Sequence, residues 1–140
     1  MIRTTTAEDA ESIASLCLQL GYDTSVEDII SRLKKAAGDK FNVVYVYESD
    51  GTVQGWIQVA IKLTVESGER AEIVGLVIAE DARRKGIGRE LVTQAEKWAQ
   101  EKGQKSIRVR TNVLRNEADT FYRALGFKES KKQTVFDRQL

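Results

Sequence analysis

A short basic and glycine-rich segment is the part of the sequence best suited to bind a ligand. It lies between an apolar run and an amphipathic stretch, and it consists of Arg83, Arg84, Lys85, Gly86, Ile87 and Gly88. The first turn of a helix leaves backbone N–H groups without an intrahelical acceptor, and the helix dipole adds partial positive charge there. Glycines also let a ligand approach the backbone. The segment therefore predicts a phosphate or diphosphate site, with a solvated basic turn as the alternative.

The glycine pattern does not fit two common nucleotide motifs. A P-loop requires Lys and Ser or Thr after its last glycine, whereas Gly88 is followed by Arg89 and Glu90. A dinucleotide fingerprint requires a third glycine, where this chain has Leu91, and an acidic residue about 20 positions later. Residues 107–110 contain no acid. A dinucleotide-dependent oxidoreductase is therefore a disfavoured alternative.

The residue counts exclude several kinds of chemistry. The chain has no histidine and a single cysteine, Cys17, so no Ser-His-Asp or Cys-His nucleophile and no zinc site of Cys and His ligands can form. We expect no metal, and we expect Cys17 to be a small buried hydrophobic residue. Lys and Arg number 22 against 21 Asp and Glu, which gives no charge excess for binding nucleic acid.

The length of 140 residues predicts one domain spanning 1–140. No stretch approaches the roughly 20 apolar residues of a membrane span, and the polar N-terminus lacks the apolar core of a secretion signal. We therefore expect a cytoplasmic protein without a membrane partner.

Hydrophobic periodicity predicts a mixed α/β domain. The expected helices are a first one from Thr6 to Gly21 and three others over 25–37, 87–102 and 116–125. The expected strands cover 2–5, 43–48, 53–65, 71–79, 106–111 and 131–137. Short turns at Asp50-Gly51 and Ser67-Gly68 predict that the middle strands form an antiparallel meander.

Two motifs in this order resemble those of the Gcn5-related N-acetyltransferase (GNAT) family. The first runs from Glu72 to Ile78 and continues in the R-x-x-G-x-G pattern of Arg83, Gly86 and Gly88. The second runs from Arg115 through Tyr122 to Gly126-Phe127. The resemblance covers nearly the whole chain. It implies a GNAT-like acyl-CoA N-acyltransferase fold, with a mixed, mostly antiparallel central sheet of about six or seven strands and about four helices on both faces.

The resemblance also implies roles for individual residues, with acetyl-CoA as the co-substrate. Tyr122 would be the general acid for the CoA thiolate, and Glu72 a general base. Backbone groups of three strand residues would pair with the pantetheine arm: Leu76, Val77 and Ile78. The diphosphate would be held by the segment of Arg83, Arg84, Lys85, Gly86, Ile87, Gly88 and Arg89. Either Arg115 or Asn116 would contact CoA.

Transfer of an acetyl group to a primary amine explains what these residues would do. The amine must lose a proton, and desolvation on an apolar strand would raise the pKa of Glu72 and make it a better base. An ion pair with Arg70 or another cation is the alternative for Glu72. A backbone N–H near Leu76 or Val77 could stabilise the oxyanion, where Gly75 permits a bulge. Direct attack in a ternary complex fits better than an acyl-cysteine intermediate.

The acceptor stays open at this point. A polyamine, an aminoglycoside-like drug, an amino acid, a protein N-terminus and a lysine side chain are all compatible with the sequence. Acidic or aromatic loop residues that could attract a cationic acceptor are Tyr22, Asp23, Glu66 and Glu69. A non-catalytic CoA-binding sensor or scaffold is the alternative function, and a homodimer is expected.

Overall fold

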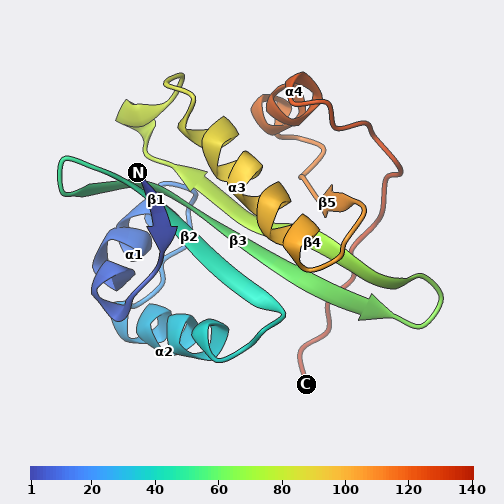
Figure 1. Cartoon of the computed structure of the whole chain (residues 1–140), viewed down its shortest axis with the longest axis horizontal. Coiled ribbons are helices and arrows are strands. Elements are labelled where there is room, and N and C mark those ends of the chain that lie inside the picture. Colours follow the sequence, from blue (N-terminus) through green and yellow to red (C-terminus); the bar gives the residue numbers. More distant parts are fainter. The chain divides into compact units, whose positions relative to one another are not determined.

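Five strands form one sheet in the computed structural model, which describes all residues from 1 to 140 (Figure 1). Their order in the sheet follows the chain: β1 (Ile2–Thr4), β2 (Asn42–Ser49), β3 (Thr52–Thr64), β4 (Gly68–Ile78) and β5 (Ile107–Val109). Strands β1 to β4 pair antiparallel, and β5 runs parallel to β4. The expected mixed, mostly antiparallel sheet is confirmed, although it has five strands instead of six or seven.

The missing strand is the one expected over 131–137, where the structure has no regular element. Its only apolar residues, Val135 and Phe136, are adjacent, so in a strand they would point to opposite faces and would give neither face an apolar surface. Both side chains are exposed. The strand expected over 106–111 is also shorter, because its pairing with β4 stops at Val109.

Four α-helices accompany the sheet: α1 (Ala10–Leu18), α2 (Val26–Ala37), α3 (Ile87–Glu101) and α4 (Asn116–Ala124). Short 3-10 turns precede two of them, η1 (Ala7–Asp9) before α1 and η2 (Glu80–Ala82) before α3. The hydroxyl of Ser25 accepts a hydrogen bond of 3.1 Å from the N–H of Asp28, which is the expected cap of α2. None of these helices is both long and apolar enough to cross a bilayer.

The chain divides into two compact units, Met1–Arg110 and Thr111–Leu140. The first unit contains the whole sheet with α1, α2 and α3, and the second contains α4. The prediction that residues 1–140 form one domain stays a prediction.

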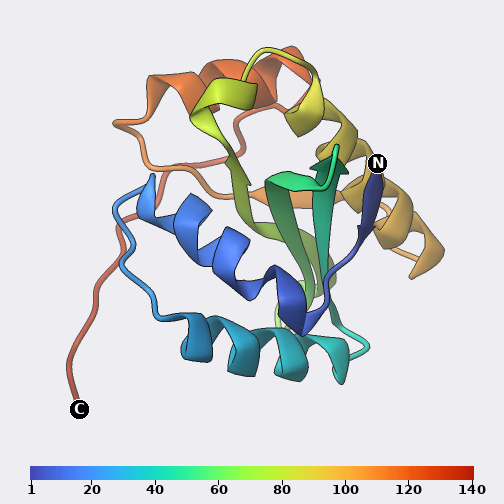
Figure 2. The same ribbon diagram turned by 90° about the vertical axis from the view of Figure 1, so that its left-hand side faces the viewer.

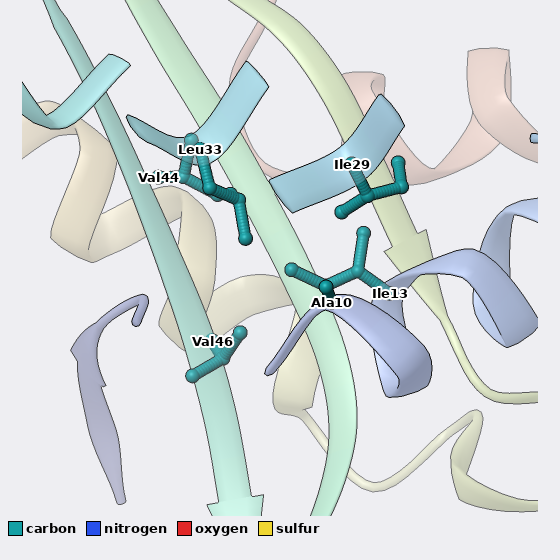
Figure 3. Packing of buried hydrophobic residues seen from close by; sticks show 6 residues of the cluster. All are labelled: Ala10, Ile13, Ile29, Leu33, Val44 and Val46. Carbon is teal, nitrogen blue, oxygen red and sulfur yellow. The ribbon is translucent and has the colours of Figure 1, made fainter. Parts of the chain in front are cut away.

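Helices α1 and α2 cover one face of the sheet. Their side chains form a cluster with alternate residues of β2 (Figure 3), and its members are Ala10, Ile13, Ile29, Leu33, Val44 and Val46. The side chain of Cys17 packs against this cluster, and its burial raises the pKa of the thiol. Cys17 is therefore part of the apolar packing, although it is half-buried and not fully enclosed.

Helix α3 covers the opposite face (Figure 2). Every residue of its expected inner stripe is buried: Ile87, Leu91, Ala95, Trp98 and Ala99. A Cβ on Gly55 of β3 would lie only 2.8 Å from Ile78 and 3.4 Å from Leu91, so this glycine permits a close approach between β3 and α3. This packing fixes the N-terminus of α3 next to the end of β4.

Candidate functional site

A β-bulge interrupts the pairing of β3 with β4 at Val74. Gln58 lies opposite Gly75 and Val59 lies opposite Ile73, which leaves Val74 as the extra residue of β4. A Cβ on Gly75 would lie 2.7 Å from two ring atoms of Trp56, so the glycine makes room for the indole. The bulge expected near Gly75 is confirmed, and it changes the course of β4.

Beyond the bulge, β4 presents backbone groups on its outer edge. Its pairing with β5 ends at Ile73 and Val109. The N–H of Ala79 donates to the carbonyl of Gln54 in β3 at 2.8 Å. Because backbone groups of an antiparallel strand alternate in direction, those of Val77 also point to β3, whereas those of Leu76 and Ile78 point to the other edge. An extended ligand can pair with that edge as an added strand does.

The loop before α3 exposes the first backbone amides of that helix. Gly86 is the N-cap, its φ is 82°, and no side chain caps the helix. A Cβ on Gly86 would meet nothing within 4 Å, so the backbone conformation is what favours glycine here. Arg84 also has a positive φ, 64°. Left-handed residues in loops are typical of concave backbone surfaces that bind anions.

Positive charge surrounds these amides. Four basic side chains of the loop and the first helical turn are exposed: Arg83, Arg84, Lys85 and Arg89. Ile87 and Gly88 are buried and anchor the helix below them. The structure therefore brings together all seven residues predicted for the diphosphate, and the arrangement can bind a diphosphate through amides, helix dipole and side-chain charge.

Glu72 is a buried carboxylate held by two cations. Its residue exposure is 4%, the ammonium of Lys62 lies 2.5 Å from Oε2, and Nε of Arg110 donates to Oε1 at 2.8 Å. Burial raises the pKa of this carboxyl, but the hydrogen bonds and charges of Lys62 and Arg110 outweigh burial and leave the pKa lowered. The expectation of a raised pKa is therefore wrong. The alternative of an ion pair is present, with these two cations and not with Arg70.

One weak signal for this ion-pair cluster is present in the sequence. Lys62 is a charged residue within a strand pattern, and Arg110 alternates with Arg108 in the next strand. Neither is close to Glu72 in the chain, so only the sheet register could bring them to it. A register cannot be predicted from short strands without knowing the position of the bulge.

Tyr122 is the buried residue of α4 in the second unit. Its ring packs edge-to-face against Phe121 and Phe127, with centroid distances of 5.0 and 5.4 Å. The N–H of Phe127 donates to the Tyr122 carbonyl at 3.0 Å, and Gly126 between them has a φ of 94°. Burial raises the pKa of the Tyr122 phenol to about 12, against a smaller opposing effect of the Arg115 charge. The phenol is therefore protonated at neutral pH.

The remaining predicted residues lie on exposed parts of the chain. Arg115 directly precedes α4 and Asn116 begins it, and both are exposed at the N-terminus of that helix. Tyr22 and Asp23 are exposed between α1 and α2. Glu66 and Glu69 are exposed at the β3–β4 hairpin. No cluster of three or more His, Cys, Asp or Glu side chains that could hold a metal ion is present.

A sequence model of the acetyltransferase (GNAT) family matches residues 8–127. The chain therefore belongs to the acetyltransferase (GNAT) family, a class of acyltransferases that use acetyl-CoA as co-substrate.

Among the relatives, the aminoglycoside N(6')-acetyltransferase type 1 of Serratia marcescens is 27% identical over 95 residues, which is 65% of this chain and 65% of that protein. The enzyme of the same description from Klebsiella aerogenes is 25% identical over 147 positions, covering 100% of this chain and 97% of that protein. A solved structure of AAC(6')-Iy with a bisubstrate analogue, CoA-S-monomethyl-acetylneamine, has a TM-score of 0.89, with 17% identity and coverage of 100% and 98%. This last likeness shows the GNAT fold.

Proposed function

We propose that the protein transfers the acetyl group of acetyl-CoA to a primary amine of a small molecule, by direct attack within a ternary complex. The observation that carries the proposal is the combination of a bulged β4 with an open outer edge and an uncapped, basic N-terminus of α3. The relatives named above support the acceptor class, because they are named for acetylating an amine of a small molecule.

The proposed binding of acetyl-CoA uses both features. The outward backbone groups of Leu76 and Ile78 would pair with the amide groups of the pantetheine arm, and the buried side chain of Val77 would hold the strand in place. The amides and charges from Arg83 to Arg89 would bind the diphosphate. Arg115 or Asn116 would add a polar contact from the N-terminus of α4.

The proposed reaction forms one C–N bond and breaks one C–S bond. The amine nitrogen attacks the thioester carbon, and the N–H of Leu76 stabilises the oxyanion because it points to the open edge. When the intermediate collapses, Tyr122 gives its proton to the CoA thiolate. A phenol with a pKa of about 12 is fully protonated at neutral pH, which is the state that a general acid requires.

Glu72 is the proposed acceptor of the proton that the attacking amine loses, directly or through water. Its lowered pKa makes it a weak base but keeps it ionised, so the carboxylate also attracts the ammonium form of the acceptor. Glu72→Gln would remove both effects. We expect it to raise KM for the acceptor and to lower kcat.

The test is CoA-thiol release from acetyl-CoA across a panel of amines that includes a polyamine, an aminoglycoside, amino acids and a lysine peptide. Wild type is expected to turn over at least one small amine, and Tyr122→Phe to lower kcat by roughly 10²-fold or more, as loss of a general acid does. Thermal unfolding and CoA affinity of Tyr122→Phe serve as controls for folding. If CoA binds but no amine releases thiol, the proposal is wrong and a non-catalytic CoA-binding domain is the better description.

A further inference from the structure

Four cationic side chains share one face of the sheet with Glu72. In the sheet register, Lys62 of β3 is opposite Arg70 of β4, and Glu72 is opposite Arg108 of β5. Residues two apart in a strand point to the same face, so Lys62, Arg70, Arg108 and Arg110 all lie on the face of Glu72. The contacts of Lys62 and Arg110 with Glu72 agree with this placement. We call these four side chains the basic cluster.

This face is the one that α1 and α2 cover and not the one that α3 covers. Ala60 of β3 lies opposite Glu72 of β4 on one side and opposite Asn42 of β2 on the other. Asn42 in turn alternates with Val44 and Val46, which pack against α1 and α2. The basic cluster thus lies on the face away from α3, toward the end of the sheet at which β3 and β4 form their hairpin.

Only part of the positive charge of the basic cluster is balanced within the strands. Lys62 and Arg110 occupy both oxygens of Glu72. Arg70 and Arg108 are half-buried, and neither forms an ion pair. A partly desolvated guanidinium without a counter-ion is unfavourable, and its planar fork matches a carboxylate.

The strand positions next to the cluster on this face supply no second carboxylate, and Glu66 and Glu69 lie beyond it at the β3–β4 hairpin. On the same face, the residues around the cluster are uncharged: Ala60, Thr64 and Gly68. Asp39, at the end of α2, accepts hydrogen bonds from the N–H of Phe41 at 2.9 Å and from the side-chain amide of Asn42 at 2.8 Å. Its carboxylate is thus used in its own loop. Within the strands, this face has one carboxylate among four cations, which disfavours a polycation because like charges at short range repel.

We propose that the acceptor is a small amine that also bears a carboxylate, as an amino acid does, with the carboxylate bound by Arg70 or Arg108 and the ammonium turned to Glu72. This inference rests on the proposed function and narrows its acceptor class. It also separates this chain from the relatives named for aminoglycosides, which carry several positive charges and no carboxylate.

The test compares amines that differ only in the carboxylate: lysine against 1,5-diaminopentane, β-alanine against ethylamine, and neamine as the polycation. Affinity is measured by calorimetry on the protein saturated with CoA, which has no acetyl group to transfer, and kcat/KM by thiol release from acetyl-CoA. Wild type is expected to favour the carboxylated member of a pair by at least about tenfold, as a charge-assisted bidentate contact provides.

Three variants identify the source of the preference. Arg70→Gln or Arg108→Gln is expected to reduce the preference to less than about threefold by weakening only the carboxylated amine. Lys97→Gln removes one positive charge from exposed α3, on the opposite face, and is expected to keep the preference. The melting temperature and CoA affinity of each variant show that it is folded.

The outcomes separate this inference from the proposed function. Thiol release with a preference for neamine or the diamine, or a carboxylate preference that survives both arginine substitutions, overturns the inference and leaves the acetyltransferase proposal standing. Absence of thiol release with every amine contradicts the proposed function. In that case the binding preference on the CoA complex alone decides whether the basic cluster selects carboxylated amines.

Discussion

Glu72 and Tyr122 hold opposite protonation states at neutral pH, and each state follows from the surroundings of the group. Two cations on half-exposed side chains keep the Glu72 carboxyl ionised in spite of burial. Burial, in part beneath the rings of Phe121 and Phe127, keeps the Tyr122 phenol protonated. An ionised carboxylate and a neutral phenol are the states that the proposed proton acceptor and proton donor require.

The phenol predicts a loss of stability at alkaline pH. The pKa of Tyr122 is about 12 in the folded chain against a model value of 10.0, so the folded state keeps a proton that the unfolded chain releases. The contribution is fully present below pH 10 and is lost as pH rises from 10 to about 12, which corresponds to about 2–3 kcal/mol. Urea unfolding of wild type and Tyr122→Phe across this window should show the difference between them shrinking as pH rises. A constant difference would contradict the assignment.

The Glu72 carboxylate predicts a loss of stability at acid pH. The pKa of Glu72 lies below its model value of 4.5, so its stabilising contribution is present above pH 4.5 and is lost as pH falls through the folded pKa. Since both cationic partners are about half-exposed, we expect Glu72→Gln to cost only about 1 kcal/mol at neutral pH. Unfolding in urea at neutral and at acid pH checks this, and the loss should disappear in acid. Lys62→Met should also lower the free energy of unfolding at neutral pH, by a smaller amount, and this loss should also disappear in acid.

The sequence allowed the type and position of both residues to be predicted, but not the environment of Glu72. The apolar run around it predicts burial, and burial alone predicts a raised pKa. The lowered value depends on Lys62 and Arg110, which reach Glu72 only through the register of three strands. The environment of Tyr122 is easier to predict, because its burial depends on residues of its own helix and on Phe127 shortly after it.

The loop before α3 positions its backbone amides by means of residues in the left-handed conformation. Gly86→Ala keeps the space around residue 86 open but strains its φ of 82°. We expect a stability loss of about 1 kcal/mol and about tenfold weaker CoA binding, because the amides shift.

Gly103→Ala is the matched control for that substitution. Gly103 follows the C-terminus of the same helix, its φ is 81°, and a Cβ there would also meet nothing within 4 Å. The Gly103→Ala variant should lose a similar free energy of unfolding, about 1 kcal/mol, and should keep its CoA affinity. Equal CoA affinities for the two variants, measured by calorimetry, would show that the loop does not hold the diphosphate.

The bulge of β4 provides a second prediction about an element. In Gly75→Ala, the new Cβ would lie 2.7 Å from the indole of Trp56, so the ring or the strand must move. We expect a loss of about 1–3 kcal/mol, as for other overpacked sites, and a lower kcat because the edge carrying Leu76 shifts. Gly38→Ala, whose Cβ would meet only ordinary contacts of 3.8 Å, should change neither stability nor kcat by much. Urea unfolding and thiol release measure both effects.

Most elements could be predicted from the sequence because their signals are local. Ser25 and Gly38 bound α2, and Asp50-Gly51 forms the turn of the β2–β3 hairpin with positive φ at both residues. The strand expected over 131–137 was wrong because β propensity says nothing about a partner strand. The length of β5 could not be predicted for the same reason, because β5 pairs with β4 only up to the bulge of that strand.

The proposed ternary complex uses two neighbouring parts of the same sheet. Helix α3 and the outer edge of β4 form the proposed acetyl-CoA site, and the face toward α1 and α2 carries Glu72 and the basic cluster. The bulge at Val74 lies between the two, where β4 stops pairing with β5. The cytoplasmic location and the homodimer stay predictions.

Equilibrium binding of acetyl-CoA to the wild-type chain, measured by calorimetry, is the decisive measurement for the proposed acetyl-CoA site. We expect one acetyl-CoA per chain, with affinity that falls as salt rises because charges at the diphosphate are screened, and with no competition from NAD. Absence of saturable binding, or displacement of acetyl-CoA by NAD, would contradict it.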